Sequence, residues 1–107
     1  RSVYKIHLLA DADEVTFVLT SGGHNAGIVS EPGHPRRRYQ LRTQYEGEIY
    51  VDPDTWQQTT PTREGSWWPA WQSWLSQRST GKTTPPSLGC PQHPALADAP
   101  GTYVLES

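Results

Sequence analysis

The stretch VTFVLTSGGH, residues 15–24, decides the fold class of this chain. Its first six residues are β-branched, aromatic or aliphatic. Only Thr16 interrupts the apolar run, which is the pattern of a strand buried on both faces. Ser21-Gly22-Gly23 ends the strand sharply, and His24 follows at once. The order of strand, paired glycines and histidine predicts an α/β fold with the histidine at the C-terminal edge of a sheet, where such folds place their sites.

His24 is the candidate catalytic residue. An imidazole with a pKa near ~6.5 can take a proton from a nucleophile and return it to a leaving group. Paired glycines let the backbone turn tightly and leave room above the ring. In α/β-hydrolases the catalytic histidine comes last in chain order, after the nucleophile and the acid. A C-terminal segment of such a domain would therefore contain the base without the nucleophile and the acid. From these residues alone, a structural histidine in a loop remains an open alternative.

The segments around this stretch alternate between helical and irregular patterns. A first helix is expected from Ser2, as its cap, to about Ala10, because apolar residues recur at helical spacing there. After the histidine we expect a short helical turn, an irregular polar loop and a short extended piece. These three segments are residues 25–29, 31–44 and 45–51.

Two more helices are predicted further along the chain. The first begins with Asp52 as cap and Pro53 at its first position. The second follows Gly65-Ser66 and runs from Trp67 to about Arg78, and its early proline is tolerated because first-turn amides lack intrahelical partners. Its apolar stripe is expected to pack into the core, with Trp68 nearer the rim. The residues of this stripe are Trp67, Trp71, Trp74 and Leu75.

The composition limits the functional classes. The 107 residues suit one small domain, residues 1–107, and a net charge of −2 gives no bulk attraction for nucleic acid. The single cysteine, Cys90, excludes an intrachain disulfide, and no apolar run approaches the ~20 residues of a membrane span. The four histidines have no cysteine or carboxylate ligand pattern, so we expect no metal site. Residues 79–101 predict an extended, irregular tail, and residues 103–105 a last extended contact.

Three separated motifs resemble the polyhydroxyalkanoate synthases with a single catalytic polypeptide. They are SGGHNAGIV at 21–29, GSWWPAW at 65–71 and APGTYV at 99–104. The resemblance covers essentially the whole chain, with the motifs in the family's order. It implies the C-terminal fragment of an α/β-hydrolase-type catalytic domain: helix, last buried strand, histidine loop, Trp-rich helix and irregular tail.

The resemblance also implies the site. In that family a cysteine replaces serine in the nucleophile elbow, and an aspartate and a histidine complete the triad. Only His24 carries over as catalytic. The aspartate would lie just upstream of Arg1 and the cysteine further upstream, and Cys90 does not lie in a nucleophile elbow. The chain starts inside a helical pattern, as a cut edge would. Because a base without a nucleophile or an orienting acid has no covalent route, we expect the fragment alone to be inactive.

The implied activity is the linking of hydroxyacyl units from coenzyme A thioesters into a polyester. The partners in the parent would be hydroxyacyl-coenzyme A and the growing chain, with no cofactor, and the location would be the cytoplasm at the surface of polyester granules. One alternative is another α/β-hydrolase, a polyester depolymerase or esterase with a serine nucleophile. A second is a non-catalytic binding module with a flat platform of tryptophans at residues 67–74.

Two further expectations concern surfaces. The run Arg36-Arg37-Arg38, with Arg42, is compatible with contacts to coenzyme A phosphates, but a solvated or salt-bridged loop is the favoured interpretation. In an α/β-hydrolase the neighbour of strand 15–20 comes from upstream. A strand without that neighbour exposes unpaired amides and carbonyls, so we expect the chain to self-associate.

Overall fold

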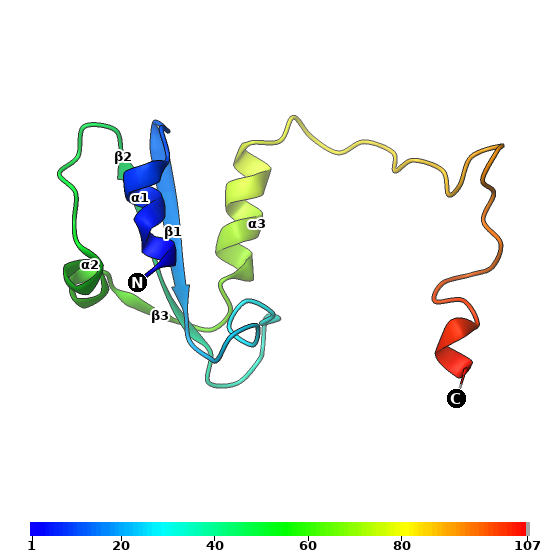
Figure 1. Cartoon of the computed structure of the whole chain (residues 1–107), viewed down its shortest axis with the longest axis horizontal. Coiled ribbons are helices and arrows are strands. Elements are labelled where there is room, and N and C mark those ends of the chain that lie inside the picture. The colour runs from blue at the N-terminus through cyan, green and yellow to red at the C-terminus, as the bar shows by residue number, and fades with distance from the viewer. Residues whose placement is uncertain (107) are drawn as a thin grey trace.

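The computed structural model describes residues 1–106. The elements in chain order are a 3₁₀ turn at Val3–Lys5, α1 (Ile6–Leu9), β1 (Glu14–Thr20), β2 (Arg38–Tyr45), α2 (Pro53–Thr59), β3 (Thr62–Glu64), α3 (Trp68–Gln77) and a 3₁₀ turn at Tyr103–Leu105. The strands form an antiparallel sheet in the order β1-β2-β3. Helices α1 and α2 lie on one face of the sheet and α3 on the other (Figure 1). The body is thus a mixed helix and strand domain, as the sequence predicted.

Strand β1 confirms the strand predicted over residues 15–20, but it has a partner within the chain. It pairs with β2 along its whole length, from Glu14 opposite Tyr45 to Thr20 opposite Tyr39. We expected this strand to have no neighbour within the chain, and this is wrong for the edge of β1 that faces β2. The other edge of β1 has no strand partner within residues 1–106, because β1 is terminal in the sheet.

Strand β2 corrects two predictions: the polar loop over residues 31–44 and the extended piece over residues 45–51. Its tyrosines, leucine and threonine alternate with arginine and glutamine, which is the period of a half-buried strand. The alternation was not recognised in the sequence because it follows directly on the arginine run, which indicated a polar loop. After Tyr45 the chain turns instead of extending, and the amide of Glu48 donates to the Tyr45 carbonyl.

An aromatic cluster forms the core under α1 and α2. Tyr4 and Trp56 are each 3% exposed, and the ring of Phe17 packs edge-on against both. The Tyr4 hydroxyl donates to the Val51 carbonyl at 2.8 Å. Burial raises the pKa of Tyr4, and the nearby Tyr50 adds to the shift. The cluster links the first helix, the edge strand β1 and α2.

The two predicted helix caps have different outcomes. Asp52 caps α2 as expected, since its carboxylate accepts from the amides of Asp54 and Thr55 at 3.0 and 3.1 Å. The hydrogen bonds from Thr55, followed by those from Asp54, lower the pKa of Asp52. Ser2 is wrong as a cap: within residues 1–106 its side chain makes no capping hydrogen bond, and its backbone is already helical.

Helix α3 forms where predicted, but its apolar stripe is not buried. Trp71 is 48% exposed, and Trp74 and Leu75 are also exposed. Between α3 and the sheet lies an open cleft of about 510 Å³. Its sheet side includes Thr16, Val18 and Leu41, and its helix side includes Trp67, Trp71 and Trp74. The expectation of core packing is wrong for the middle of this helix, because α3 contacts the body chiefly near its two ends.

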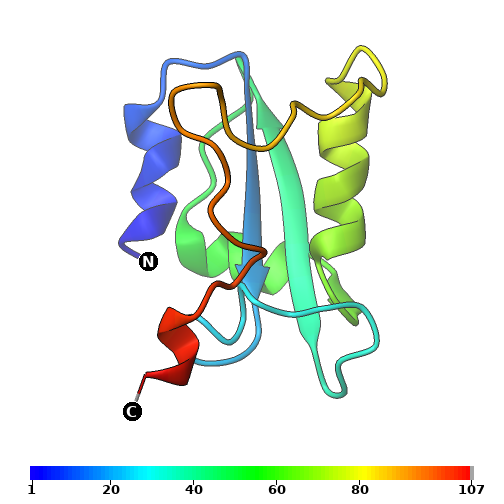
Figure 2. The same ribbon diagram turned by 90° about the vertical axis from the view of Figure 1, so that its right-hand side faces the viewer.

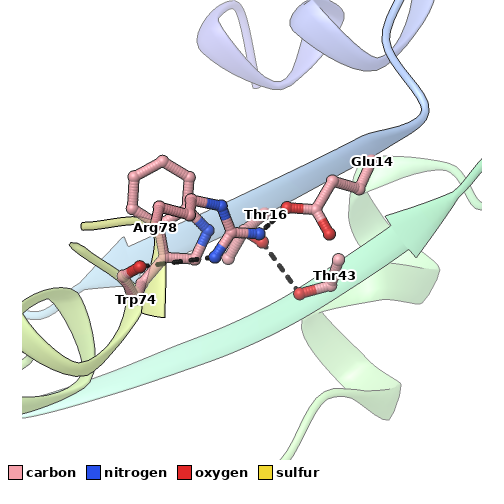
Figure 3. A network of polar contacts seen from close by, with 5 residues as sticks. All are labelled: Glu14, Thr16, Thr43, Trp74 and Arg78. Carbon is pink, nitrogen blue, oxygen red and sulfur yellow. Dashed lines mark hydrogen bonds and ion pairs between the residues drawn. The ribbon is translucent and has the colours of Figure 1, made fainter. Parts of the chain in front are cut away.

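The C-terminal end of α3 is held by the polar network of Figure 3. Arg78 forms an ion pair with Glu14 at the start of β1 and lies over the Trp74 ring, 4.1 Å from the ring centroid. Across the strand pair below, the hydroxyls of Thr16 and Thr43 are hydrogen bonded at 2.8 Å. This network fixes α3 to the sheet at the end opposite the histidine.

Residues 79–100 are exposed and contain no helix or strand, and Cys90 forms an isolated bridge with His93. The tail runs away from the body in Figure 1 and crosses in front of it in the view of Figure 2. The final contact predicted as extended is instead the 3₁₀ turn at Tyr103–Leu105. Among the described residues, no helix is long and apolar enough to cross a membrane.

Candidate functional site

His24 lies in the loop that follows β1, as the sequence predicted. This histidine loop, residues 21–30, connects β1 to the approach of β2. The His24 backbone has φ 27°, in the left-handed region that non-glycine residues seldom adopt, at a cost of the order of 1–3 kcal/mol. Its side chain is exposed, and within residues 1–106 it makes no hydrogen bond. The ring is thus free to meet groups from outside this chain.

Two glycines set the shape of the histidine loop. A Cβ on Gly27 would collide with the Thr20 hydroxyl and lie 2.9 Å from the Ser21 carbonyl oxygen. Gly22 has φ 111°, and a Cβ there would lie 2.8 Å from the Arg37 guanidinium. A Cβ on Gly23 would meet no described heavy atom within 4 Å. The positive φ at Gly22 and the close packing at Gly27 therefore favour glycine at these two positions, whereas nothing in the described structure requires it at Gly23.

The start of the histidine loop is fixed to β2. The Ser21 amide donates to the Arg38 carbonyl at 2.9 Å, and the Arg38 amide donates to the Ser21 hydroxyl at 3.0 Å. These bonds continue the strand pairing by one residue. His24 therefore leaves the sheet from a fixed point, three residues beyond the last backbone bond.

The end of the loop is fixed to the start of α3. The indole N–H groups of Trp67 and Trp68 both donate to the Ile28 carbonyl, at 3.0 and 2.9 Å. The Ser66 hydroxyl donates to the carbonyl of Ser30, which is buried, and it accepts from the Trp68 amide at 3.0 Å. The sequence analysis missed this role, because it assigned the tryptophans to core packing. The signal was present in the two motifs SGGHNAGIV and GSWWPAW, which are one structural unit.

The arginine run is solvated at Arg36 and Arg38, as expected, but it does not lie wholly in a loop. Arg36 turns the chain with φ 60°, and Arg38 is the first residue of β2. Arg37 is half-buried against Gly22, and one of its terminal nitrogens lies 3.3 Å from His34 Nε2. Its Nε is buried and has no partner among the described residues. Arg37 therefore supports the turn that precedes His24.

The remaining candidate groups lie apart from His24. Cys90 is exposed in the tail, where its backbone pairs with His93, and Figure 1 shows the tail well away from the histidine loop. No cluster of three or more potential metal ligands exists in the described part of the chain. Within residues 1–106, His24 thus forms no ion pair and belongs to no cluster of potential metal ligands.

Comparisons with known proteins identify the family. No family model and no solved structure matches the chain. "Poly(3-hydroxyalkanoate) polymerase 2" of Ectopseudomonas oleovorans is 39% identical over 105 residues, which is 97% of this chain and 18% of that protein. The chain belongs to the poly(3-hydroxyalkanoate) polymerase family. The resemblance inferred from the three motifs is confirmed.

Other polymerases match a similar part of the chain. The "poly(3-hydroxyalkanoate) polymerase subunit PhaC" of Rhizobium etli is 36% identical over 87% of this chain, and that of Cupriavidus necator is 31% identical over 87%. The chain spans only 14% and 15% of these two relatives. It therefore corresponds to a small part of a polymerase, and the role of His24 stays a prediction.

Proposed function

We propose that this chain supplies the general base, His24, of a polymerase that joins hydroxyacyl units from coenzyme A thioesters. The similarity to polymerases over 97% of the chain is the observation that supports this most. The position of His24 in an exposed loop, fixed at both ends, agrees with a base that meets a nucleophile from another part of the protein.

The proposed chemistry is acyl transfer through a covalent thioester. His24 removes the proton of a cysteine thiol outside this chain, and the sulfur attacks the hydroxyacyl thioester, so that coenzyme A leaves as the thiol. The histidine then removes the proton of a hydroxyl group, and the hydroxyl oxygen attacks the enzyme-bound acyl group. The ester forms as the thioester bond to the cysteine breaks, and the cysteine sulfur leaves and takes the proton back from the imidazolium. An aspartate outside this chain would orient the ring and stabilise the imidazolium. The polymerase would act in the cytoplasm, at the surface of the polyester granule.

The test is His24→Ala in a polymerase that contains this chain, with His93→Ala in the exposed tail as the matched control. Polymer formation and coenzyme A release should be lost in the first variant and kept in the second, with unchanged circular dichroism in both. The 107-residue chain alone should release no coenzyme A above its own His24→Ala variant. Near-normal turnover by the His24→Ala polymerase would end the proposal.

The nature of the nucleophile separates a polymerase from a serine depolymerase or esterase. Iodoacetamide should abolish activity and a serine-directed fluorophosphonate should not, and Cys90→Ser should change neither result. The second alternative, a tryptophan binding module, is favoured only by the exposed Trp71 and Trp74. It also required a mostly β domain, whereas helices cover both faces of this sheet (Figure 1).

We also propose that the isolated chain self-associates through the edge of β1 that does not face β2. This edge is seven residues long and pairs with no strand in the described residues. Light scattering across a dilution series should show a mass that falls towards the monomer. A constant monomer mass at every concentration would contradict the proposal.

A further inference from the structure

We infer that Trp67 and Trp68 are positioning residues for His24, acting through the Ile28 carbonyl. This inference rests on the proposed function, because it assumes that His24 is the base. Two neighbouring indoles reach the same carbonyl oxygen from residues 39 and 40 positions away in the chain. A carbonyl oxygen has two lone pairs, so both bonds can form at once.

The loop needs such a support. His24 has a left-handed backbone, and unfavourable conformations of this kind persist only when the surrounding structure holds them. The Ser21 bonds hold the chain three residues before His24, and the Ile28 carbonyl is held four residues after it. The intervening turn is closed by the Ala26 amide, which donates to the Gly23 carbonyl at 2.8 Å. Within residues 1–106, removing the Ile28 anchor would leave the loop held after His24 only by the Ser66 bond to the Ser30 carbonyl, which lies two residues further along the chain.

The anchor itself is rigid. Ser66 links the buried Ser30 carbonyl to the Trp68 amide, so the backbone at the start of α3 is bound to the loop independently of the indoles. Trp67 stacks on Trp71 with 5.2 Å between ring centroids, which fixes the direction of the Trp67 N–H. At the other end, the ion pair of Arg78 with Glu14 adds a second contact between α3 and the sheet. The helix that carries the two indole donors is therefore itself attached to the rest of the structure.

The test uses phenylalanine, which keeps an aromatic ring and removes the N–H donor. Trp67→Phe and Trp68→Phe in the polymerase should each lower kcat about fivefold and leave KM nearly unchanged, because the base is misplaced while the substrate contacts lie elsewhere. The matched control is Trp74→Phe on the same helix, since no hydrogen bond of the Trp74 indole is present in the described part of the chain and phenylalanine keeps a ring beneath Arg78. It should keep the original kcat.

Amide hydrogen exchange in the 107-residue chain gives a second readout, which does not depend on activity. In the Trp67→Phe and Trp68→Phe variants the amides of Ala26 and Val29 should exchange faster, while the amides of β1 keep their rates. Faster exchange across β1 as well would show general destabilisation and would overturn the positioning role. Unchanged exchange at Ala26 and Val29 would also overturn it.

The outcomes separate this inference from the proposed function. If His24→Ala removes activity while both tryptophan variants keep their kcat, the positioning role is wrong and the base assignment stands. If His24→Ala keeps activity, the base assignment fails, and with it the positioning role. A fall in kcat with the exchange change confined to the histidine loop supports both.

Discussion

The aromatic core makes the sharpest stability prediction, because Trp56 and Trp71 are the same residue type in opposite surroundings. Trp56 is 3% exposed and packs against Phe17 and Tyr4, whereas Trp71 is 48% exposed. Burial of a large aromatic ring removes about 150–250 Å² from water, which at ~25 cal/mol per Å² is worth about 4–6 kcal/mol. We expect Trp56→Ala to lower the free energy of unfolding by about 3–5 kcal/mol. Trp71→Ala should cost about half as much, roughly 2 kcal/mol.

The assay is urea unfolding of the 107-residue chain, followed by far-UV circular dichroism because both variants lose a fluorophore. A loss of this size is a large part of the stability of a small domain, so Trp56→Phe provides a milder variant that stays folded. It should rank between the original chain and Trp56→Ala. Equal losses for Trp56→Ala and Trp71→Ala, or a larger loss at Trp71, would refute the assignment of the core to the α1 and α2 face.

Other predictions test the same structure elsewhere. The raised pKa of Tyr4 means that the protonated phenol is favoured in the folded chain. The contribution of the Tyr4 pKa shift to the free energy of unfolding should be complete below pH ~10, the pKa of an unfolded tyrosine. It should disappear as the pH rises through the raised pKa, so Tyr4→Phe should make the stability depend less on pH in the alkaline range. Gly27→Ala should lower Tm and Gly23→Ala should not, because only the first added Cβ collides with neighbouring atoms. A double-mutant cycle on Glu14 and Arg78 should give a coupling below ~1 kcal/mol that shrinks with added salt, since the pair is partly exposed.

Local signals in the sequence predicted local structure well. Asp52 followed by Pro53 indicates a helix start whatever lies elsewhere in the chain, and α2 begins there. The run before Ser21 has the composition of a strand, and the glycines that follow place His24 just beyond it. These features depend on residues within one turn or one strand of each other, so a single sequence is enough to find them.

The features that were missed depend on distant partners. Strand β2 is stabilised by β1, and its alternation of Tyr39, Leu41 and Thr43 is weak evidence without that neighbour. The indole bonds to Ile28 require a loop and a helix that lie some 40 residues apart to meet. Burial of α3 was overestimated because apolar spacing predicts which face turns inward, but not whether the sheet below it is close enough to cover that face.

The order of the strands has a consequence for folding kinetics. Each strand pairs with the next one in the chain, but the paired residues are far apart in sequence: Thr20 lies opposite Tyr39, and Glu14 lies opposite Tyr45. Such non-local pairing favours slow folding. The histidine loop lies inside the first of these connections, between β1 and β2. We therefore expect the loop that bears His24 to close in the same step as the first strand pair, with protection of its amides appearing together with that of β1 in a quenched-flow exchange experiment. Protection of the Val29 amide after that of β2 and β3 is complete would show that the loop is instead the last part to become ordered.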